Sequence, residues 1–368
     1  MKQESIGRFC KYILLLISFV ICAGSIAAAN DSDDQYWHMM VPPESGFSSF
    51  VNALTVFHGE VIAAGVFSTA GTDTLNSIAR WDGKKWRPMG PGMDAPIWCL
   101  AVYKGDLIAG GEFKNAGGVA ANGIARWDGT VWQPLGFGVR GSTKDEWVHV
   151  TTMTEFKGDL IVGGRFSFAG RSRIQSMARW NGREWLDISY EIAGDVKAVT
   201  VYHGQLVATG DISEPSSGTV IQYFDGVDHW SVLGKGEPDD EVDALFVHGD
   251  SLIVAGKFSK IAGVEALGVA SWDGTSWGRL SVGLGQNIWC LGDFDGRLVA
   301  AGANGAVASW NGSSWESLGT GTNGDISSLL EFDHKLIVAG GFTRAGQVRA
   351  ARIAVWDKST SIASDNDK

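Results

Sequence analysis

Charged residues are scarce in this chain, and its positive charges are scattered rather than clustered. Only 19% of the 368 residues are charged and 45% are hydrophobic, which is not the composition of a disordered protein. The 30 lysines and arginines are outnumbered by 41 acidic residues, so the net charge is −11. Because nucleic-acid phosphates are bound by clustered cations, we expect no nucleic-acid partner.

Long apolar runs are also lacking outside the N-terminal segment. Residues 12–22 form an apolar stretch that follows basic residues and precedes three alanines at 27–29, so residues 1–29 are predicted to be a signal peptide. An uncleaved membrane anchor is the alternative. No later stretch reaches the roughly 18 apolar residues of a membrane span. We therefore expect a secreted protein, located outside the cell, at its surface or in the periplasm.

Glycine and tryptophan, with 50 and 16 residues, are unusually abundant. Both recur in a unit whose cleanest copy is residues 107–136. Its first apolar strand ends in two glycines, which would let a neighbouring sheet approach closely. A later strand ends in Trp127, and the Asp-Gly pair after it favours a type I′ hairpin turn. The unit therefore predicts antiparallel strands joined by tight turns.

The unit occurs seven times, and a β-branched residue marks its first strand in every copy. These residues are Val51, Ile97, Val150, Val196, Val242, Ile288 and Ile326. A period near 46 residues with four short strands per unit is typical of a β-propeller. The recurring aromatic side chains would fill the wedges between sheets, each contributing about 2–3 kcal/mol.

The two ends of the chain each hold part of one unit. The seventh copy has only three strands and is followed by a polar tail at residues 359–368, while residues 35–40 resemble an isolated fourth strand. Pairing the two parts would close the ring and remove two open sheet edges. We therefore predict an all-β domain over residues 30–358. It is a seven-bladed β-propeller with four antiparallel strands per blade, and the N-terminal strand completes the last blade.

The strand ending in two glycines and the downstream tryptophans resemble the kelch-like propellers, in the broad sense that includes the central domain of galactose oxidase and secreted bacterial repeat proteins. The resemblance covers residues 36–358 and implies the fold, but no particular activity, because propellers host unrelated functions. The Trp-Asp-Gly turn departs from the kelch pattern. It makes the Trp-Asp repeat family the rival, although that family's Gly-His landmark is missing here.

Motifs that carry chemistry are absent from the sequence. It has no nucleophile elbow, no metal-spaced His-Glu motif and no phosphate loop, so we expect no catalytic residue, no metal and no cofactor. Cys99 and Cys290 occupy equivalent places four repeats apart, which favours two buried thiols over a disulfide. The acidic run at residues 237–243 matches no calcium loop; we interpret it as a solvated connector, with calcium binding as the alternative.

The candidate binding residues are the variable positions that directly follow the β-branched landmarks. They are Asn52, Trp98, Thr151, Lys197, Asp243, Trp289 and Ser327. They begin the innermost strands, on the face where the resemblance implies that propeller ligands bind. Trp98 and Trp289 would offer stacking surfaces or would pack between blades. Three loop residues on the same predicted face complete the set: Trp147, Arg171 and Arg173.

These observations favour a monomeric binding or scaffold module that recognises a protein or a glycan through the axial loop face. The alternative is a carbohydrate-active enzyme, a lyase or hydrolase. Two carboxylates, or a His–Tyr pair, within about 6 Å at the mouth of the axis would favour the enzyme. A purely structural repeat would have no concave site.

Overall fold

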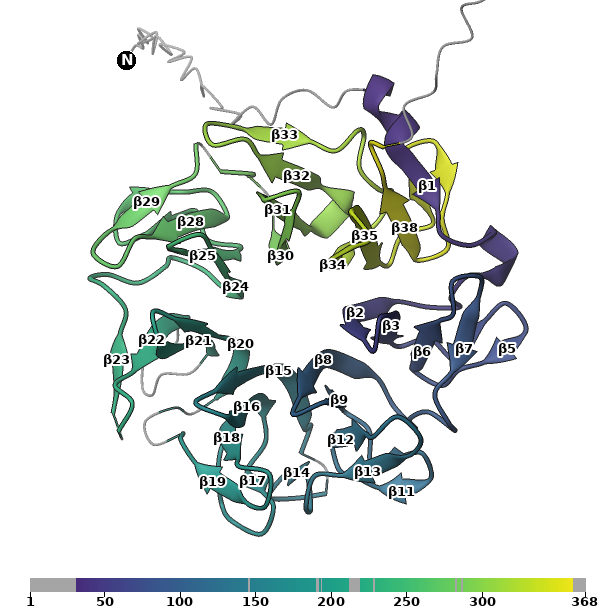
Figure 1. The fold of residues 1–368 in the computed structure, drawn as a ribbon. Helices are drawn as coiled ribbons and strands as arrows, with labels where there is room; N and C mark the ends of the chain where they lie inside the picture. The colour runs from purple at the N-terminus through teal and green to yellow at the C-terminus, as the bar shows by residue number, and fades with distance from the viewer. Residues whose placement is uncertain are drawn as a thin grey trace, which may run out of the picture.

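Seven four-stranded antiparallel sheets stand around a common axis in this computed structural model (Figure 1). The structure describes residues 31–359 except 145, 190, 191, 193, 212–218, 228, 282 and 286. The predicted seven-bladed β-propeller is thereby confirmed. The signal-peptide prediction at residues 1–29 and the tail from residue 360 lie outside the described residues. Within the described part, no helix is long and apolar enough to cross a bilayer.

Each blade runs outward from an inner strand at the axis to an outer strand at the rim. Blade 1 consists of β2 (Val51–Phe57), β3 (Glu60–Gly65), β6 (Ile78–Trp81) and β7 (Trp86–Pro88). Blade 2 consists of β8 (Ile97–Tyr103), β9 (Asp106–Gly111), β12 (Ile124–Trp127) and β13 (Trp132–Pro134). Blade 3 consists of β15 (His149–Phe156), β16 (Asp159–Arg165), β18 (Met177–Trp180) and β19 (Trp185–Asp187). Blade 4 consists of β20 (Asp195–Tyr202), β21 (Gln205–Asp211), β22 (Val220–Phe224) and β23 (Trp230–Val232).

The remaining blades follow the same order. Blade 5 consists of β24 (Val242–His248), β25 (Ser251–Gly256), β28 (Val269–Trp272) and β29 (Trp277–Arg279). Blade 6 consists of β30 (Ile288–Phe294), β31 (Arg297–Gly302), β32 (Val307–Trp310) and β33 (Trp315–Ser317). Blade 7 consists of β34 (Ile326–Phe332), β35 (Lys335–Gly340), β38 (Ile353–Trp356) and the N-terminal β1 (Trp37–Met39).

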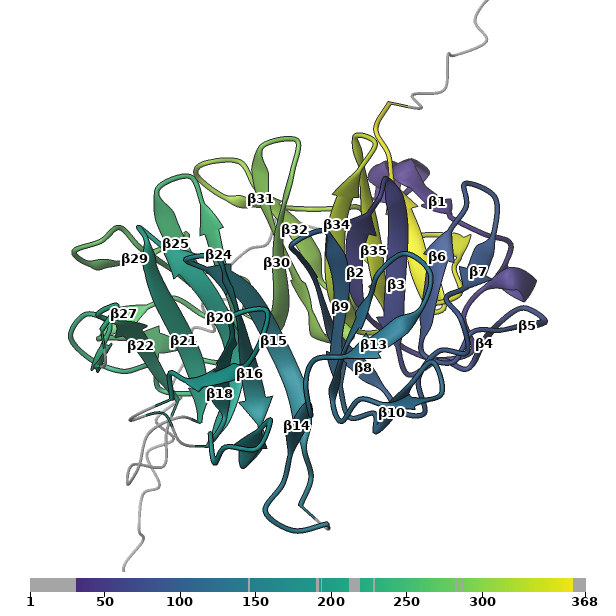
Figure 2. The same cartoon turned by 60° about the horizontal axis from the view of Figure 1, so that its bottom comes forward.

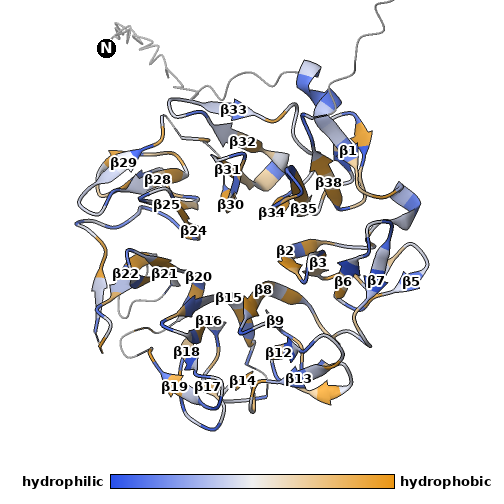
Figure 3. Ribbon diagram, in the orientation of Figure 1, coloured by the Kyte–Doolittle hydropathy of each residue, from blue (hydrophilic) through white to orange (hydrophobic). Residues whose placement is uncertain are grey.

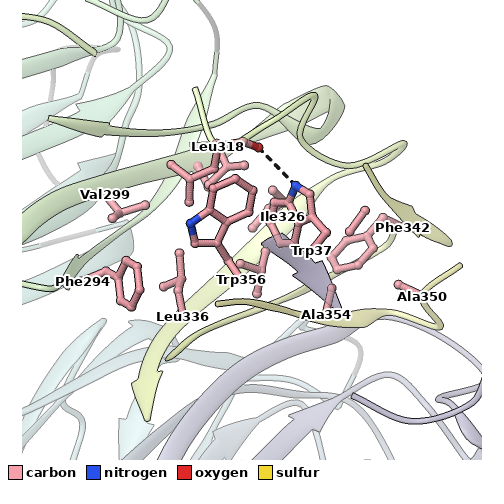
Figure 4. Close-up of a cluster of buried hydrophobic side chains, with 14 residues drawn as sticks. Trp37, Phe294, Val299, Leu318, Ile326, Leu336, Phe342, Ala350, Ala354 and Trp356 are labelled. Carbon is pink, nitrogen blue, oxygen red and sulfur yellow. Dashed lines mark hydrogen bonds between the residues drawn. The ribbon is translucent and has the colours of Figure 1, made fainter. Parts of the chain in front are cut away.

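The ring closes as predicted, through the N-terminal strand. β1 pairs antiparallel with β38, so that Trp37 lies opposite Trp356. Trp37 is 1% exposed, and its indole N–H donates to the carbonyl of Leu318 at 3.2 Å (Figure 4). The strand is shorter than the predicted residues 35–40, because residues Asp31–Tyr36 form a 3-10 helix, η1. In η1 the buried Asp34 carboxylate accepts hydrogen bonds from the backbone N–H and the hydroxyl of Thr320.

The apolar core is divided among the interfaces between blades. Seven clusters of buried side chains occur, and each combines residues of two neighbouring blades. Figure 3 shows the apolar residues concentrated in the strands of the ring. Outer-strand tryptophans also donate their indole N–H to a carbonyl at the preceding blade, at 2.9–3.2 Å. These pairs are Trp132 with Met89, Trp185 with Leu135, Trp230 with Ile188, and Trp315 with Leu280. At these interfaces the hydrogen bond adds to the apolar packing, whereas the buried indole N–H groups of Trp86 and Trp277 have no partner among the described residues.

A β-bulge interrupts every inner strand immediately after its β-branched landmark. The glycine that ends the second strand lies opposite that landmark. In blade 2, a Cβ on Gly111 would collide with the carbonyl of Pro96 in the same blade, whereas a Cβ on Gly110 would collide with Val150 of blade 3. The expected close approach of a neighbouring sheet therefore holds for Gly110, but Gly111 is required by the bulge of its own blade.

Replacing Gly302 with alanine is expected to destabilise the protein by about 1–3 kcal/mol, because the new Cβ would displace the backbone carbonyl of Asn287. Urea unfolding followed by tryptophan fluorescence measures the effect. Gly292→Ala in the same blade is the matched control, since its Cβ would meet the Leu329 side chain at an ordinary 3.4 Å. Equal stabilities of the two variants would contradict this explanation of the glycine.

The axial loop face is the side of the ring on which the inner strands begin. It carries the connections between blades and, within the residues that the structure describes, five two-stranded ribbons. The ribbons are β4–β5 (Thr69–Ala70, Asp73–Thr74), β10–β11 (Asn115–Ala116, Val119–Ala120), β14–β17 (Val139–Arg140, Phe168–Ala169), β26–β27 (Lys260–Ile261, Val264–Glu265) and β36–β37 (Arg344–Ala345, Val348–Arg349). Figure 2 shows the segment around β14 extending farther from the ring than the other connections.

Candidate functional site

The bulges place all seven variable residues at one structural position. In each inner strand the register shifts across the residue that follows the landmark, and this bulge residue has no ladder partner. The bulge residues are Asn52, Trp98, Thr151, Lys197, Asp243, Trp289 and Ser327, and all are half-buried. Neighbouring inner strands contact one another around the axis. The sequence candidates are thus brought together as a ring at the axial end of the loop face.

Three bulge residues use their side chains to join neighbouring blades. Asn52 Nδ2 donates to the carbonyl of Ile97 at 2.9 Å, and Thr151 Oγ1 donates to that of Val196 at 2.5 Å. Ser327 Oγ donates to the carbonyl of Val51 at 2.6 Å. Inner strands have one unpaired edge, and these bonds satisfy carbonyl groups along it. For these positions the structure shows a role in holding the ring together.

The two axial tryptophans are not neighbours. Trp98 belongs to blade 2 and Trp289 to blade 6, with blades 7 and 1 between them. The indole N–H of Trp98 donates to Glu112 Oε1 at 2.9 Å. This hydrogen bond fixes the indole group, which is half-buried. A ligand that stacks on both tryptophans would have to reach across part of the axial mouth.

Lys197 and Asp243 form the charged part of the ring together with two residues the sequence analysis did not select. Lys197 Nζ lies 2.9 Å from Glu241 Oε2 and 3.2 Å from Asp243 Oδ1, and Lys257 Nζ contacts the same Glu241 oxygen at 2.6 Å. Two carboxylates and two ammonium groups from blades 4 and 5 therefore meet at one point. Glu241 was missed because it precedes the bulge, and Lys257 because it follows a different strand.

The pKa values of the charged groups in this cluster are shifted in different directions. Hydrogen bonds from Lys257 and Lys197 lower the pKa of Glu241. Burial raises the pKa of Asp243 by more than Lys197 lowers it, and its Oδ2 is buried without a hydrogen-bond partner among the described residues. Burial alone would lower the pKa of Lys197, but Glu241 and Asp243 outweigh it and raise that pKa. The two neighbouring carboxylates thus have pKa values shifted in opposite directions.

Asp243→Asn is expected to stabilise the protein by about 0.5–1 kcal/mol at neutral pH, because the raised pKa shows that the site disfavours the charged form. In the wild type, the stability linked to Asp243 is present below its unfolded pKa of about 3.9 and is lost as the pH rises through the folded value. The gain should therefore vanish in acid. Thermal melts of both proteins between pH 3 and pH 8 measure it; a lower melting temperature for the variant at pH 7 would contradict the assignment.

The three loop candidates belong to blade 3 and are not bulge residues. Trp147 is 57% exposed and its ring rests 4.3 Å from that of the buried His149. Arg171 is exposed and places its guanidinium 4.5 Å from the ring centroid of Phe137. Arg173 is exposed as well. All three residues lie on connections of blade 3, and no hydrogen bond, ion pair or ring contact joins them to the bulge residues within the described part of the chain.

The acidic run at residues 237–243 is more than a solvated connector. Asp239 accepts hydrogen bonds from the backbone N–H groups of Ser259 and Lys260, which fixes the ribbon β26–β27. Glu241 and Asp243 belong to the charged cluster described above. The carboxylates of Asp239, Glu241 and Asp243 therefore have protein partners.

One group with metal-ligating chemistry lies on the opposite face and was not found from the sequence. The ligand atoms of Asp295, Glu331 and His334 lie within 4.8 Å of one another, and all three residues are exposed. His334 has φ of 57° and lies in the tight turn between β34 and β35. The group combines a turn residue of blade 6 with two residues of blade 7, so the packing of these two consecutive blades brings it together.

Among the cavities lined by described residues, three lie between neighbouring blades. One of about 670 Å³ lies between blades 7 and 1, one of about 880 Å³ between blades 4 and 5, and one of about 410 Å³ between blades 5 and 6. The largest is lined by aromatic residues that include Tyr202, Tyr223 and Trp277. The predicted site residues line none of these three cavities.

The thiols of Cys99 and Cys290 are free, and burial raises the pKa of both.

Comparison with known proteins identifies the fold. No family profile and no curated protein matches the chain. Among solved structures, YCF48 bound to D1 peptide has a TM-score of 0.56 and 13% identity, and the match covers 87% of this chain and 94% of that one. The WD40 propeller domain of Doa1 has a TM-score of 0.57 and 14% identity over 88% of this chain and 97% of that one.

A third match is an extracellular domain. It belongs to the putative hybrid two-component system BT4673 of B. thetaiotaomicron, with a TM-score of 0.55 and 10% identity, and it covers 87% of this chain and 39% of that one. At these identities the matches support the propeller fold alone. The kelch-like assignment made from the sequence stays a prediction.

Proposed function

We propose that the protein is an exported, kelch-like binding module that recognises a protein or a glycan through the axial loop face. The observation that carries the proposal is the ring of bulge residues. The backbone is the same in every blade, yet the half-buried residue at the bulge varies from asparagine to tryptophan, lysine and aspartate. A constant scaffold that presents different side chains on one face is suited to recognition.

Two of the structural matches are consistent with this proposal. One is a propeller bound to a peptide, and another is an extracellular domain. Export rests on the signal-peptide prediction for residues 1–29. The charged cluster offers both signs of charge, and the two axial tryptophans offer apolar surface.

A screen of the protein comprising residues 30–368 on glycan and peptide arrays tests the proposal. A ligand is expected, and it should be lost from variants of the bulge residues. A ligand that binds equally to these variants would place recognition elsewhere. A screen with no ligand in either class would contradict a binding function.

The second candidate function, a carbohydrate-active enzyme, is favoured by one observation. Glu241 and Asp243 are neighbouring carboxylates with pKa values shifted in opposite directions, an arrangement that suits a base and an acid. Against it, Lys197 contacts both carboxylates and occupies the place between them. Cleavage of a polysaccharide that is lost in both Glu241→Gln and Asp243→Asn would establish the enzyme in place of the binding module.

A further inference from the structure

The ribbon of blade 3 carries a surface that differs in charge from the rest of this acidic protein. We call it the blade 3 arm and define it as residues 137–144, 146–149 and 166–173. β14 pairs with β17 so that Arg140 lies directly opposite Phe168, and the Arg140 guanidinium is 4.0 Å from that ring centroid. Arg171 covers Phe137 in the same way at 4.5 Å. Two guanidinium groups therefore lie over the faces of aromatic rings.

The cations of the arm are not neutralised by the described part of the chain. Arg140, Arg171 and Arg173 are exposed, and none of them has a carboxylate partner among the described residues. The nearby Glu146 is turned inward. Its carboxylate accepts hydrogen bonds from the backbone N–H and hydroxyl of Ser142 and from the hydroxyl of Ser167, at 2.5–2.7 Å.

Each guanidinium remains able to bind an anion. Stacking uses the planar face of the group, while its N–H donors lie in the plane and match a carboxylate or sulfate through two parallel hydrogen bonds. Stacking also fixes the orientation of the side chain before binding, so less rotational freedom is lost when the ligand binds.

Exposed apolar side chains belong to the same arm. Phe137 is 54% exposed and Trp147 is 57% exposed. The apolar CH face of a sugar ring packs on an exposed tryptophan, while acid groups on the same chain reach the guanidinium groups. The arm projects from the ring (Figure 2), and it lines none of the three cavities described above.

We propose that the blade 3 arm binds an acidic polysaccharide, whose carboxylate or sulfate groups are held by Arg140 and Arg171 and whose sugar rings pack on Trp147. The inference rests on the proposed function and names its ligand class. An acidic peptide offers the same charges, but peptides are usually held in a groove or along a sheet edge. A chain of charged sugars matches a projecting surface with alternating cationic and aromatic side chains.

Calorimetric titration of the protein comprising residues 30–368 with polygalacturonate, with heparin and with neutral dextran tests the proposal. Binding of at least one acidic polysaccharide is expected, together with none of dextran and a clear weakening in 300 mM NaCl. The first two ligands distinguish carboxylate from sulfate recognition. Equal binding of dextran, or equal binding of polyglutamate or of a single-stranded oligonucleotide, would overturn the proposal.

Variants locate the site. Arg140→Gln with Arg171→Gln is expected to weaken binding at least about tenfold, since hydrogen bonds to charged groups are lost. Trp147→Ala is expected to weaken it as well. The matched control is Arg349→Gln, on the corresponding ribbon β36–β37 of blade 7, where the arginine is exposed. Unchanged affinity of the double variant, or an equal loss in the control, would overturn the proposal.

The outcome is separable from that of the proposed function. If the arrays yield a ligand that depends on the bulge residues while acidic polysaccharides do not bind, only the present inference fails. If no ligand of any class engages the axial loop face, both fail. Circular dichroism melts of each variant show whether a loss of binding reflects unfolding.

Discussion

Deleting residues 31–40 is expected to lower the free energy of unfolding by at least about 3–5 kcal/mol, the cost of losing a buried tryptophan alone. The deletion removes β1, which supplies the fourth strand of blade 7, and with it the fully buried Trp37. It also removes Asp34, whose carboxylate joins η1 to Thr320. Since domains have total stabilities of roughly 5–15 kcal/mol, the deletion should remove a large share of the stability. Guanidinium unfolding followed by tryptophan fluorescence measures the change.

Single substitutions separate closure from a general effect of truncation. Trp37→Ala should show most of the loss, because its ring packs against Trp356 and its N–H bonds Leu318. Met39→Ala is the matched control on the same strand, since Met39 is 50% exposed. A truncated chain that unfolds at the same denaturant concentration as the full one would show that the termini do not close the ring.

Replacing Trp98 and Trp289 together with alanine is expected to reduce ligand affinity by about 30-fold or more, because buried aromatic anchors contribute about 2 kcal/mol or more to an interface. Both residues are half-buried, so the fold should survive the change. Titration of the ligand found on the arrays measures the affinity, and thermal melts report the fold.

Single substitutions distinguish a Trp98 ring that stacks on the ligand from one that packs between blades. Glu112→Gln keeps the Trp98 ring but alters the acceptor of its N–H, so it is expected to change affinity less than Trp98→Ala does. Loss of folding in the tryptophan variants would assign these residues to the core of the ring. Full affinity in a folded double variant would exclude them from the site.

The fold was predictable because the same sequence unit occurs seven times and its number and spacing indicate the architecture. Seven β-branched landmarks, one isolated strand at the N-terminal end and a last unit with only three strands determine the number of blades and the closure, whatever the loops do. The bulges were not predicted, because a bulge changes the pairing between two strands and leaves no mark in the spacing along one of them. Gly111 shows the consequence: its role depends on the carbonyl of Pro96, which only the bulged geometry brings near.

The site was predictable only in part, for a related reason. The position of Lys197 and Asp243 follows from the repeat, but the contact of Lys197 with Glu241 depends on how blades 4 and 5 pack against each other. The contact of Glu241 with Lys257 depends on the pairing of two strands within blade 5. The stacking of Arg140 on Phe168 likewise needs the register of a two-residue ribbon. Interactions between repeats are set by the geometry of the ring, which one unit of sequence does not contain.

Hydrogen–deuterium exchange with and without the ligand tests most directly whether the axial loop face is the recognition surface. Protection is expected at the starts of the inner strands, around Trp98 and Trp289, and in the blade 3 arm. Protection confined to the opposite face, at the turn holding Asp333 and His334 or in the cavity between blades 7 and 1, would contradict it.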